Sequence, residues 1–345
     1  MSDRCGTILQ LPVELLRDEI FAKYLECNFI ITKCSLVCKN WLQISADCKL
    51  IIDVKKNCQS FAKYCQSQRL LNIVGFSSTD NSSLGIFVKY CTDFQRLKSL
   101  NLFFCLKECF EHISKFTNLE MLSITQSDFE NALWIGNFTQ LTYLNLNGNF
   151  VGRSGCENIR NCQSIMELNL SNNDLQDDAC VYLSELKNLK ILLVENNDIG
   201  ENGCESLSRI ETLTKLNISR NHIHDDGFSN ICKLSNLTHL HASCCLIGSV
   251  SNLTNLNKLI ELELSGNLID NEGVKVISEM QNLRILNLVN SYMHISDDAV
   301  HYLTKLVNLE LLDLSENSLN IEDIDCLKSL PRLREVKILT RHKYF

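Results

Sequence analysis

Two histidines and two cysteines lie within a span of seven residues, and imidazole and thiolate groups are common metal ligands. His239 and His241 are two residues apart, so on an extended strand both imidazoles project from the same face. Cys244 and Cys245 follow closely. Cys245, however, occupies a position that recurs along the chain and should point to the other side. Because short motif matches are often accidental, we predict no metal site here.

Pairs of acidic or amide residues also recur, and isolated pairs of this kind could bind a metal or act as general acid and base. These pairs recur at the same place in a repeat of 22 to 26 residues, which indicates one structural role for all of them. An amphipathic segment follows each pair, so we expect the pairs to accept hydrogen bonds at helix N-termini. They are Asp177–Asp178, Glu201–Asn202, Asp225–Asp226, Asn271–Glu272 and Asp297–Asp298.

The remaining chemistry-bearing residues point to packing rather than catalysis. Cys156, Cys180 and Cys204 are spaced 24 residues apart, and Phe228 takes the next position at that spacing, which favours a core position over a reactive thiol. Neither Arg153 nor Arg220 is set apart as the dedicated arginine of a GTPase activator. We find no glycine-rich phosphate loop, nucleophile motif or zinc spacing. We therefore predict no catalytic residue and no cofactor.

The dominant signal is an eleven-residue template, L-x-x-L-x-L-x-x-N-x-L, repeated along most of the chain. Its eleven copies begin at Leu97, Leu119, Leu141, Ile165, Leu189, Leu213, Leu237, Leu259, Leu283, Leu309 and Leu333. The segment LNIVGF from Leu71 is a candidate degenerate first copy. This template is that of leucine-rich repeats, in which each copy supplies one short parallel strand and one short helix.

The residue type at each position of the template has a physical reason. Alternate residues of the L-x-L core point into the solenoid and must be apolar. The asparagine should satisfy backbone groups of neighbouring repeats and form a ladder, at Asn149, Asn173, Asn197, Asn221, Asn267 and Asn317. Cys105, Ser127, Cys245 and Ser291 take this position in other copies, and we expect weaker rungs there.

The residues between the buried strand positions face outward and form the predicted partner-binding face. They are Tyr143, Asn145, Leu193, Glu195, Lys215, Asn217, Arg220, His239, His241, Glu261, Glu263, Ile285, Asn287, Leu311 and Asp313. The pattern predicts a basic middle beside an acidic C-terminal end, with apolar spots between them. An open face of this kind suits a protein or a long peptide better than a small molecule.

Composition narrows the choice of partner and compartment. The net charge of -8 and the pI of about 5.6 favour neither nucleic acid nor an anionic membrane. The first residues lack the apolar run of a secretory signal, and no stretch approaches the length of a membrane span. We therefore expect the 18 cysteines to stay reduced, in the cytoplasm or the nucleus.

The first 50 residues do not fit the repeat and predict compact helices. The segments LPVELLRDEIFAKYLE and SLVCKNWLQISAD each carry an apolar face at helical spacing. This region resembles the F-box, the module through which substrate receptors join SCF-type cullin ubiquitin ligases. The resemblance implies contact with a Skp-type adaptor through Leu11, Pro12, Leu15, Leu16, Ile20, Phe21, Leu25, Val37 and Trp41. Extra residues between Leu16 and Ile20, between Phe21 and Tyr24 and before Val37 depart from the family pattern.

The complete prediction is an α/β protein built as a leucine-rich-repeat solenoid. We expect a horseshoe with parallel strands on the concave face and short helices on the convex face, preceded by a small all-α F-box-like module. The predicted divisions are the module at 7–50, a connector with an irregular first repeat at 51–96, and the repeat domain at 97–345. The predicted function is that of a non-enzymatic substrate receptor that bridges a Skp-type adaptor and cullin ligase to a target protein. The alternative is a scaffold or inhibitor unrelated to ubiquitin, in which the N-terminal helices cap the first repeat.

Overall fold

The computed structural model describes residues 50–54, 73–78, 84–85, 87–88, 94–105, 109–127, 134–293, 295–317, 319 and 321–338. All nine predicted adaptor-binding side chains, from Leu11 to Trp41, lie outside these residues. The chain divides into two compact units, 1–128 with 137–143 and 129–136 with 144–345.

The first unit contains four parallel strands in chain order, each paired with the next. They are β1 (Leu50–Val54), β2 (Ile73–Ser78), β3 (Ser99–Phe103) and β4 (Met121–Thr125), accompanied by the 3-10 helix η3 (Phe94–Arg96) and the helix α7 (Phe110–Ile113). Strand β2 covers most of the degenerate copy expected from Leu71. Strand β1 is an additional strand that the template did not predict.

The second unit repeats one strand and one helical segment many times. Strand β5 (Tyr143–Asn145) falls where the two units meet in sequence. The strands that follow are β6 (Glu167–Asn169), β7 (Ile191–Leu193), β8 (Lys215–Asn217), β9 (His239–His241), β10 (Glu261–Glu263), β11 (Ile285–Asn287), β12 (Leu311–Asp313) and β13 (Glu335–Lys337). From β6 to β13 each strand pairs with the next in parallel.

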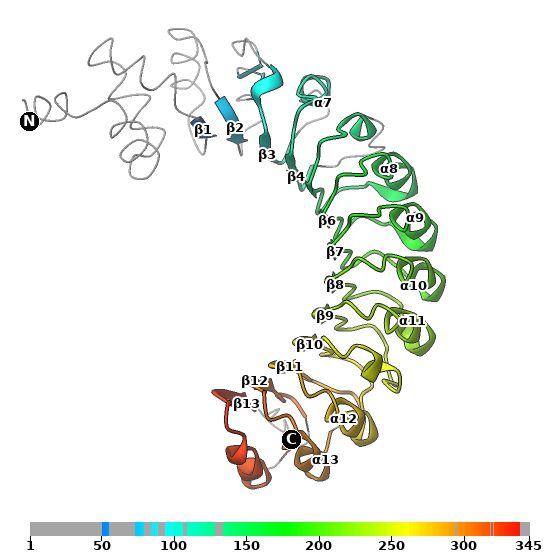
Figure 1. Cartoon of the computed structure of the whole chain (residues 1–345), viewed down its shortest axis with the longest axis vertical. Helices are drawn as coiled ribbons and strands as arrows, with labels where there is room; N and C mark the ends of the chain where they lie inside the picture. The colour runs from blue at the N-terminus through cyan, green and yellow to red at the C-terminus, as the bar shows by residue number, and fades with distance from the viewer. Residues whose placement is uncertain are drawn as a thin grey trace, which may run out of the picture. The chain divides into compact units, whose positions relative to one another are not determined.

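Short helices connect these strands. They are α8 (Gly152–Ile159), α9 (Gln176–Leu183), α10 (Glu201–Leu207), α11 (His224–Ile231), α12 (Asn271–Ile277) and α13 (Asp297–Leu303), and 3-10 turns η5 (Ile135–Asn137), η6 (Leu253–Asn255) and η7 (Ile321–Ser329) replace them in the other repeats. Within this unit the strands line the inner side of the curve and the helices lie outside (Figure 1). Strands β3 to β13 correspond one to one with the eleven predicted copies, so the leucine-rich-repeat fold is confirmed.

Burial follows the template. The middle residue of each strand from β6 to β12 is at most 2% exposed, as at Leu192 and Leu240. Cys156, Cys180 and Cys204 are fully buried, and Phe228 is 1% exposed at the equivalent position, which confirms the predicted core role. Helices of seven or eight residues are marginal alone, so packing between repeats must supply their stability.

The asparagine ladder is confirmed with its geometry. Asn197 Nδ2 donates to the carbonyls of Leu170 (2.8 Å) and Glu195 (3.1 Å), and its Oδ1 accepts from the backbone N–H of Asn173 (2.8 Å). Asn221 repeats the arrangement, with its Oδ1 accepting from Asn197 N–H at 3.0 Å. Each rung therefore joins two repeats through buried backbone groups.

The expected weaker rungs show two different outcomes. Cys245 Sγ donates to the Ile218 carbonyl at 3.3 Å, so the thiol replaces one asparagine donor. Ser291 Oγ is buried without a hydrogen-bond partner among the described residues. The ladder thus continues past Cys245 in reduced form and has its poorest rung at Ser291.

The acidic and amide pairs join repeats to one another. Asp177 Oδ1 accepts from Gly200 N–H at 2.6 Å, where the next helix begins, and Asn271 Oδ1 accepts from Ser296 N–H at 3.1 Å. Asp225 Oδ1 accepts from Gly248 N–H at 2.7 Å. The expectation of helix capping therefore needs correction for these three residues, because the accepted N–H belongs to the following repeat.

Candidate protein-binding face

The outward residues of the second unit form two rows across the parallel sheet. Strand register places Glu167, Ile191, Lys215, His239, Glu261, Ile285, Leu311 and Glu335 in the first row. The second row contains Asn169, Leu193, Asn217, His241, Glu263, Asn287, Asp313 and Lys337. All these side chains are partly or fully exposed, which places the predicted partner-binding residues of β7 to β12 on one face.

Several Asn and Asp side chains, in the second row or at the equivalent position of β5, also serve the backbone. Oδ1 of Asn145, Asn217 and Asp313 accepts from the N–H two residues later, each at 3.0 Å. Asn287 makes the same contact at 3.1 Å. These four predicted binding residues therefore turn the chain out of the strand, and a partner meets side chains that are already engaged. The recurring Asn or Asp at this position was the signal in the sequence for that role.

Within β6 to β12, three second-row positions break this pattern. Leu193, His241 and Glu263 cannot reproduce the short amide contact, and they lie on β7, β9 and β10. Glu263 Oε2 instead accepts from Asn287 Nδ2 at 3.2 Å. At these three positions the fold does not require Asn or Asp, so the side chain can serve to contact a partner protein.

A histidine and glutamate cluster occupies the centre of the face. His241 Nε2 lies 2.7 Å from Glu261 Oε1, and His239 Nε2 lies 3.8 Å from Glu261 Oε2. His239 Nδ1 also lies 2.8 Å from Thr238 Oγ1. Burial and the neighbouring Lys215 charge lower the pKa of His239 below its ordinary value, while Glu261 partly opposes this effect. His239 is thus predominantly neutral at pH 7.

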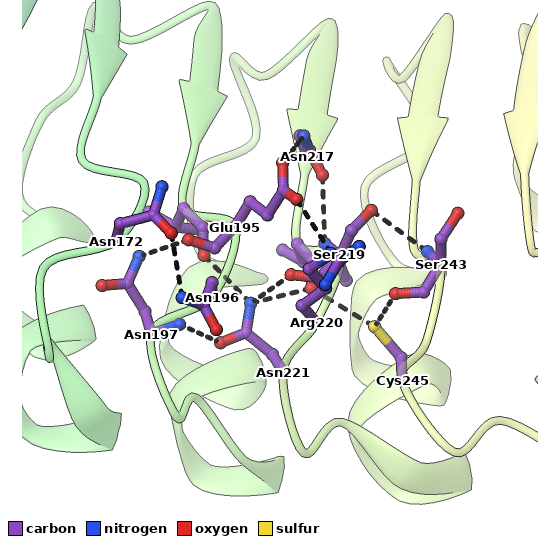
Figure 2. A network of polar contacts seen from close by, with 12 residues as sticks. Asn172, Glu195, Asn196, Asn197, Asn217, Ser219, Arg220, Asn221, Ser243 and Cys245 are labelled. Carbon is purple, nitrogen blue, oxygen red and sulfur yellow. Dashed lines mark hydrogen bonds and ion pairs between the residues drawn. The ribbon is translucent and has the colours of Figure 1, made fainter. Parts of the chain in front are cut away.

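A second polar network lies beside this cluster, on the turns after β7 and β8 (Figure 2). Glu195 Oε1 pairs with Arg220 Nε at 3.3 Å, and its Oε2 accepts from Asn217 Nδ2 at 3.2 Å. Asn196 Nδ2 donates to Asn172 Oδ1 at 2.9 Å on the preceding turns. Glu195 therefore holds one amide and one guanidinium from the next repeat.

The predicted basic middle of the face is largely neutralised. Arg220 is paired with Glu195, His241 contacts Glu261, and the pKa of His239 is lowered. Lys215 remains as the principal positive charge of this part. The sequence showed the charges but not the contacts that compensate them across strands.

Apolar side chains on the face come in adjacent pairs. Ile191 and Leu193 share strand β7, and Ile285 pairs with Leu311 across β11 and β12. Leu311 is 36% exposed. Exposed apolar residues at neighbouring positions of a sheet are a feature of interaction surfaces.

The cysteine and arginine side chains that were candidates for chemistry occupy structural positions. Cys245 points into the core, and burial raises the pKa of its thiol to about 12. Arg153 Nη1 pairs with Asp178 at 3.1 Å and Nη2 donates to Tyr182 Oη at 3.3 Å, on the helical side. Within the ranges that the structure describes, no group of three His, Cys, Asp or Glu side chains is arranged to hold a metal ion. In the same ranges no helix has the length and apolar character needed to cross a membrane.

Comparison with known proteins agrees with this geometry. The family model described as leucine-rich repeat region matches residues 96–344. An internalin (inlF) from Listeria monocytogenes aligns over 84% of this chain and 84% of its own, with 22% identity and a TM-score of 0.62. A TDR receptor aligns over 84% of this chain and 50% of its own, with 19% identity and a TM-score of 0.56. No curated protein matches the sequence. The two structural likenesses show the fold.

Proposed function

Because this chain belongs to the leucine-rich repeat region family, we propose that it is a protein-binding substrate receptor of an SCF-type cullin ubiquitin ligase. The repeats supply a protein-binding scaffold. The F-box-like segment from Leu11 to Trp41 supports the ligase role, since it contains the L-P-x-E-L-L and V-C-K-x-W patterns ahead of the repeats. Such a receptor acts in the cytoplasm or nucleus.

The mechanism of this receptor is positional. The N-terminal module binds a Skp-type adaptor, and the sheet face from β7 to β12 binds the target. Holding the target near the ubiquitin-loaded enzyme raises its effective concentration without any acid or base from this chain. The partly exposed Leu193, His241 and Glu263, which the backbone does not need, support β7 to β10 as part of the target site.

Direct binding to purified Skp-type adaptor tests this proposal. We expect the full chain to bind, and a variant with Leu11→Ala, Pro12→Ala and Ile20→Ala to lose at least about tenfold in affinity, because these apolar side chains would be central contacts. Leu311→Ala on the repeat face is the matched control and should bind the adaptor normally. Failure of the wild-type chain to bind, or unchanged binding by the triple variant, would favour the non-ubiquitin scaffold with an N-terminal helical cap.

A further inference from the structure

The longest repeat carries an insertion in the loop after its ladder residue. The step from Leu283 to Leu309 is 26 residues, compared with 24 in most repeats. The buried Ile199 follows ladder residue Asn197 by two positions, whereas the buried Ile295 follows Ser291 by four. Two residues have therefore been added between Ser291 and Ile295, in the loop that follows β11, and insertions in repeat proteins often lie on a binding face.

The insertion exposes two large apolar side chains. Tyr292 is 54% exposed and Met293 is 58% exposed. The backbone N–H of Tyr292 donates to the Asn267 carbonyl at 2.9 Å, which ties the insertion to the end of the β10 repeat. Tyrosine and methionine are enriched at protein interfaces, and an exposed adjacent pair is a costly feature for a surface with no partner.

The neighbouring strands carry negative charge. On β10 to β12 the outward side chains are Glu261, Glu263, Ile285, Asn287, Leu311 and Asp313, so this set contains three carboxylates and no lysine or arginine. At the opposite, amino ends of these strands, Arg284 and Arg334 both pair with Glu310. At the carboxyl ends, Glu263 and Asp313 lie on the two strands that flank β11, and β11 is the strand that leads to Tyr292.

We propose that β10 to β12 and the insertion form a docking surface for an extended basic segment of a partner protein, with lysine or arginine next to apolar residues. The cationic side chains face Glu261, Glu263 and Asp313, and the apolar residues contact Tyr292, Met293 and Leu311. Charge complementarity and the apolar pair together select this partner over an acidic segment or a nucleic acid. The proposal deepens the target-binding role and rests on it, but it is independent of adaptor binding.

Fluorescence anisotropy with the full chain tests this surface. The probes are two labelled synthetic peptides of equal length, one with lysines flanking a leucine pair and the other with glutamates in place of the lysines. We expect only the lysine peptide to bind, with an affinity that falls as salt is raised. Equal binding of the two peptides, or no binding of the lysine peptide, would overturn the proposal.

Two variants separate the charged and the apolar contributions. Glu261→Gln with Glu263→Gln and Asp313→Asn should weaken binding of the lysine peptide at least about tenfold, because charged contacts are removed. The control with the same change in charge is Glu205→Gln, Glu279→Gln and Asp325→Asn, at exposed positions on the helical side, and it should bind normally. Equal losses in the two triple variants would show a nonspecific effect of net charge and contradict the proposal.

The apolar contribution has its own control. Tyr292→Ser with Met293→Ser should weaken binding at least about tenfold, while Tyr292→Phe with Met293→Leu should retain it. Both native side chains are exposed, and circular dichroism would verify that each variant folds. Unchanged binding by the serine variant would remove the insertion from the docking surface. Adaptor binding by all these variants should be normal, so failure here is distinguishable from failure of the ligase role.

Discussion

At the scale of single residues, a ladder asparagine in six of the repeats satisfies buried backbone groups. Asn197 is 1% exposed and links the repeats of β6 and β7 through two hydrogen bonds of 2.8 Å, and a third bond of 3.1 Å joins it to the Glu195 carbonyl in its own repeat. Buried backbone groups without partners are costly, so the value of this side chain exceeds that of an ordinary surface amide.

We predict that Asn197→Ala lowers the free energy of unfolding by about 2–4 kcal/mol, because it leaves buried N–H and carbonyl groups unpaired. Urea unfolding followed by circular dichroism measures the change. Asn230→Ala is the control, since its amide lies on helix α11 and only contacts Lys233 at the surface. A loss of similar size in both variants would show that the ladder contributes no special stability.

His239 gives a prediction for pH dependence. Its pKa lies below the ordinary value of 6.5, first because of burial and then because of Lys215, while Glu261 acts in the opposite direction. As the pH falls through the ordinary value, the unfolded chain therefore takes up this proton more readily than the folded chain. His239 then contributes to loss of stability below about pH 6.5, and the full contribution is reached below its folded pKa.

Titration of the imidazole resonances by NMR measures this pKa. Lys215→Gln should raise it because a nearby positive charge is removed, and Glu261→Gln should lower it further. Lys233→Gln, in the turn that follows helix α11, should leave it unchanged. If the variants at Lys215 and Lys233 give the same His239 titration, the charge of Lys215 does not lower the pKa of His239.

At the scale of elements, sequence reasoning located every strand from β3 to β13 because the leucine spacing reports burial directly. It missed a backbone feature that accompanies each ladder position. The residue before the ladder residue has a positive φ at Gly148, Asn172, Asn196, Arg220 and Gly266. Glycine and asparagine are the residues that favour this conformation. Because other residues such as Arg220 also occupy the position, the sequence did not reveal the recurring positive φ. Strand pairing, not local preference, determines the conformation there.

Gly266 allows a test of this turn. Its φ is +65°, and an added Cβ would lie 2.8 Å from Cys244 Sγ of the preceding repeat. We predict that Gly266→Ala costs about 1–2 kcal/mol for the left-handed backbone, with a further loss from the sulfur contact. Thermal unfolding measures the loss of stability from the backbone and from the sulfur contact together. The loss caused by Gly266→Ala should be smaller when Cys244→Ala is also present.

The matched control is Gly248→Ala. Its added Cβ would approach no atom closer than 3.6 Å, and Gly248 is not among the glycines with positive φ, so the change should be nearly neutral. An equal cost of Gly266→Ala with and without Cys244→Ala would exclude the sulfur contact as a cause.

At the scale of the whole molecule, contacts are mainly between neighbouring repeats within each unit. Stability in such an array is close to a sum of repeat and interface contributions, so it need not be uniform along the chain. The outward face of the sheet could be anticipated from the alternation of buried and exposed residues. The contacts of Arg220 with Glu195 and of His241 with Glu261 could not be anticipated from the sequence. They join residues 20 or more positions apart and depend on strand register.

Within the second unit, the quality of the ladder predicts where opening is easiest. Full asparagine rungs follow one another at Asn173, Asn197 and Asn221, whereas Ser291 Oγ has no partner among the described residues. In hydrogen exchange measured across denaturant concentrations, amides of residues 165–225 should open at higher free energy than those of 292–338. Ser291→Asn should narrow this difference, since it can restore the missing rung. A single opening free energy for all amides, or slower exchange in the C-terminal repeats, would contradict the link between ladder and local stability.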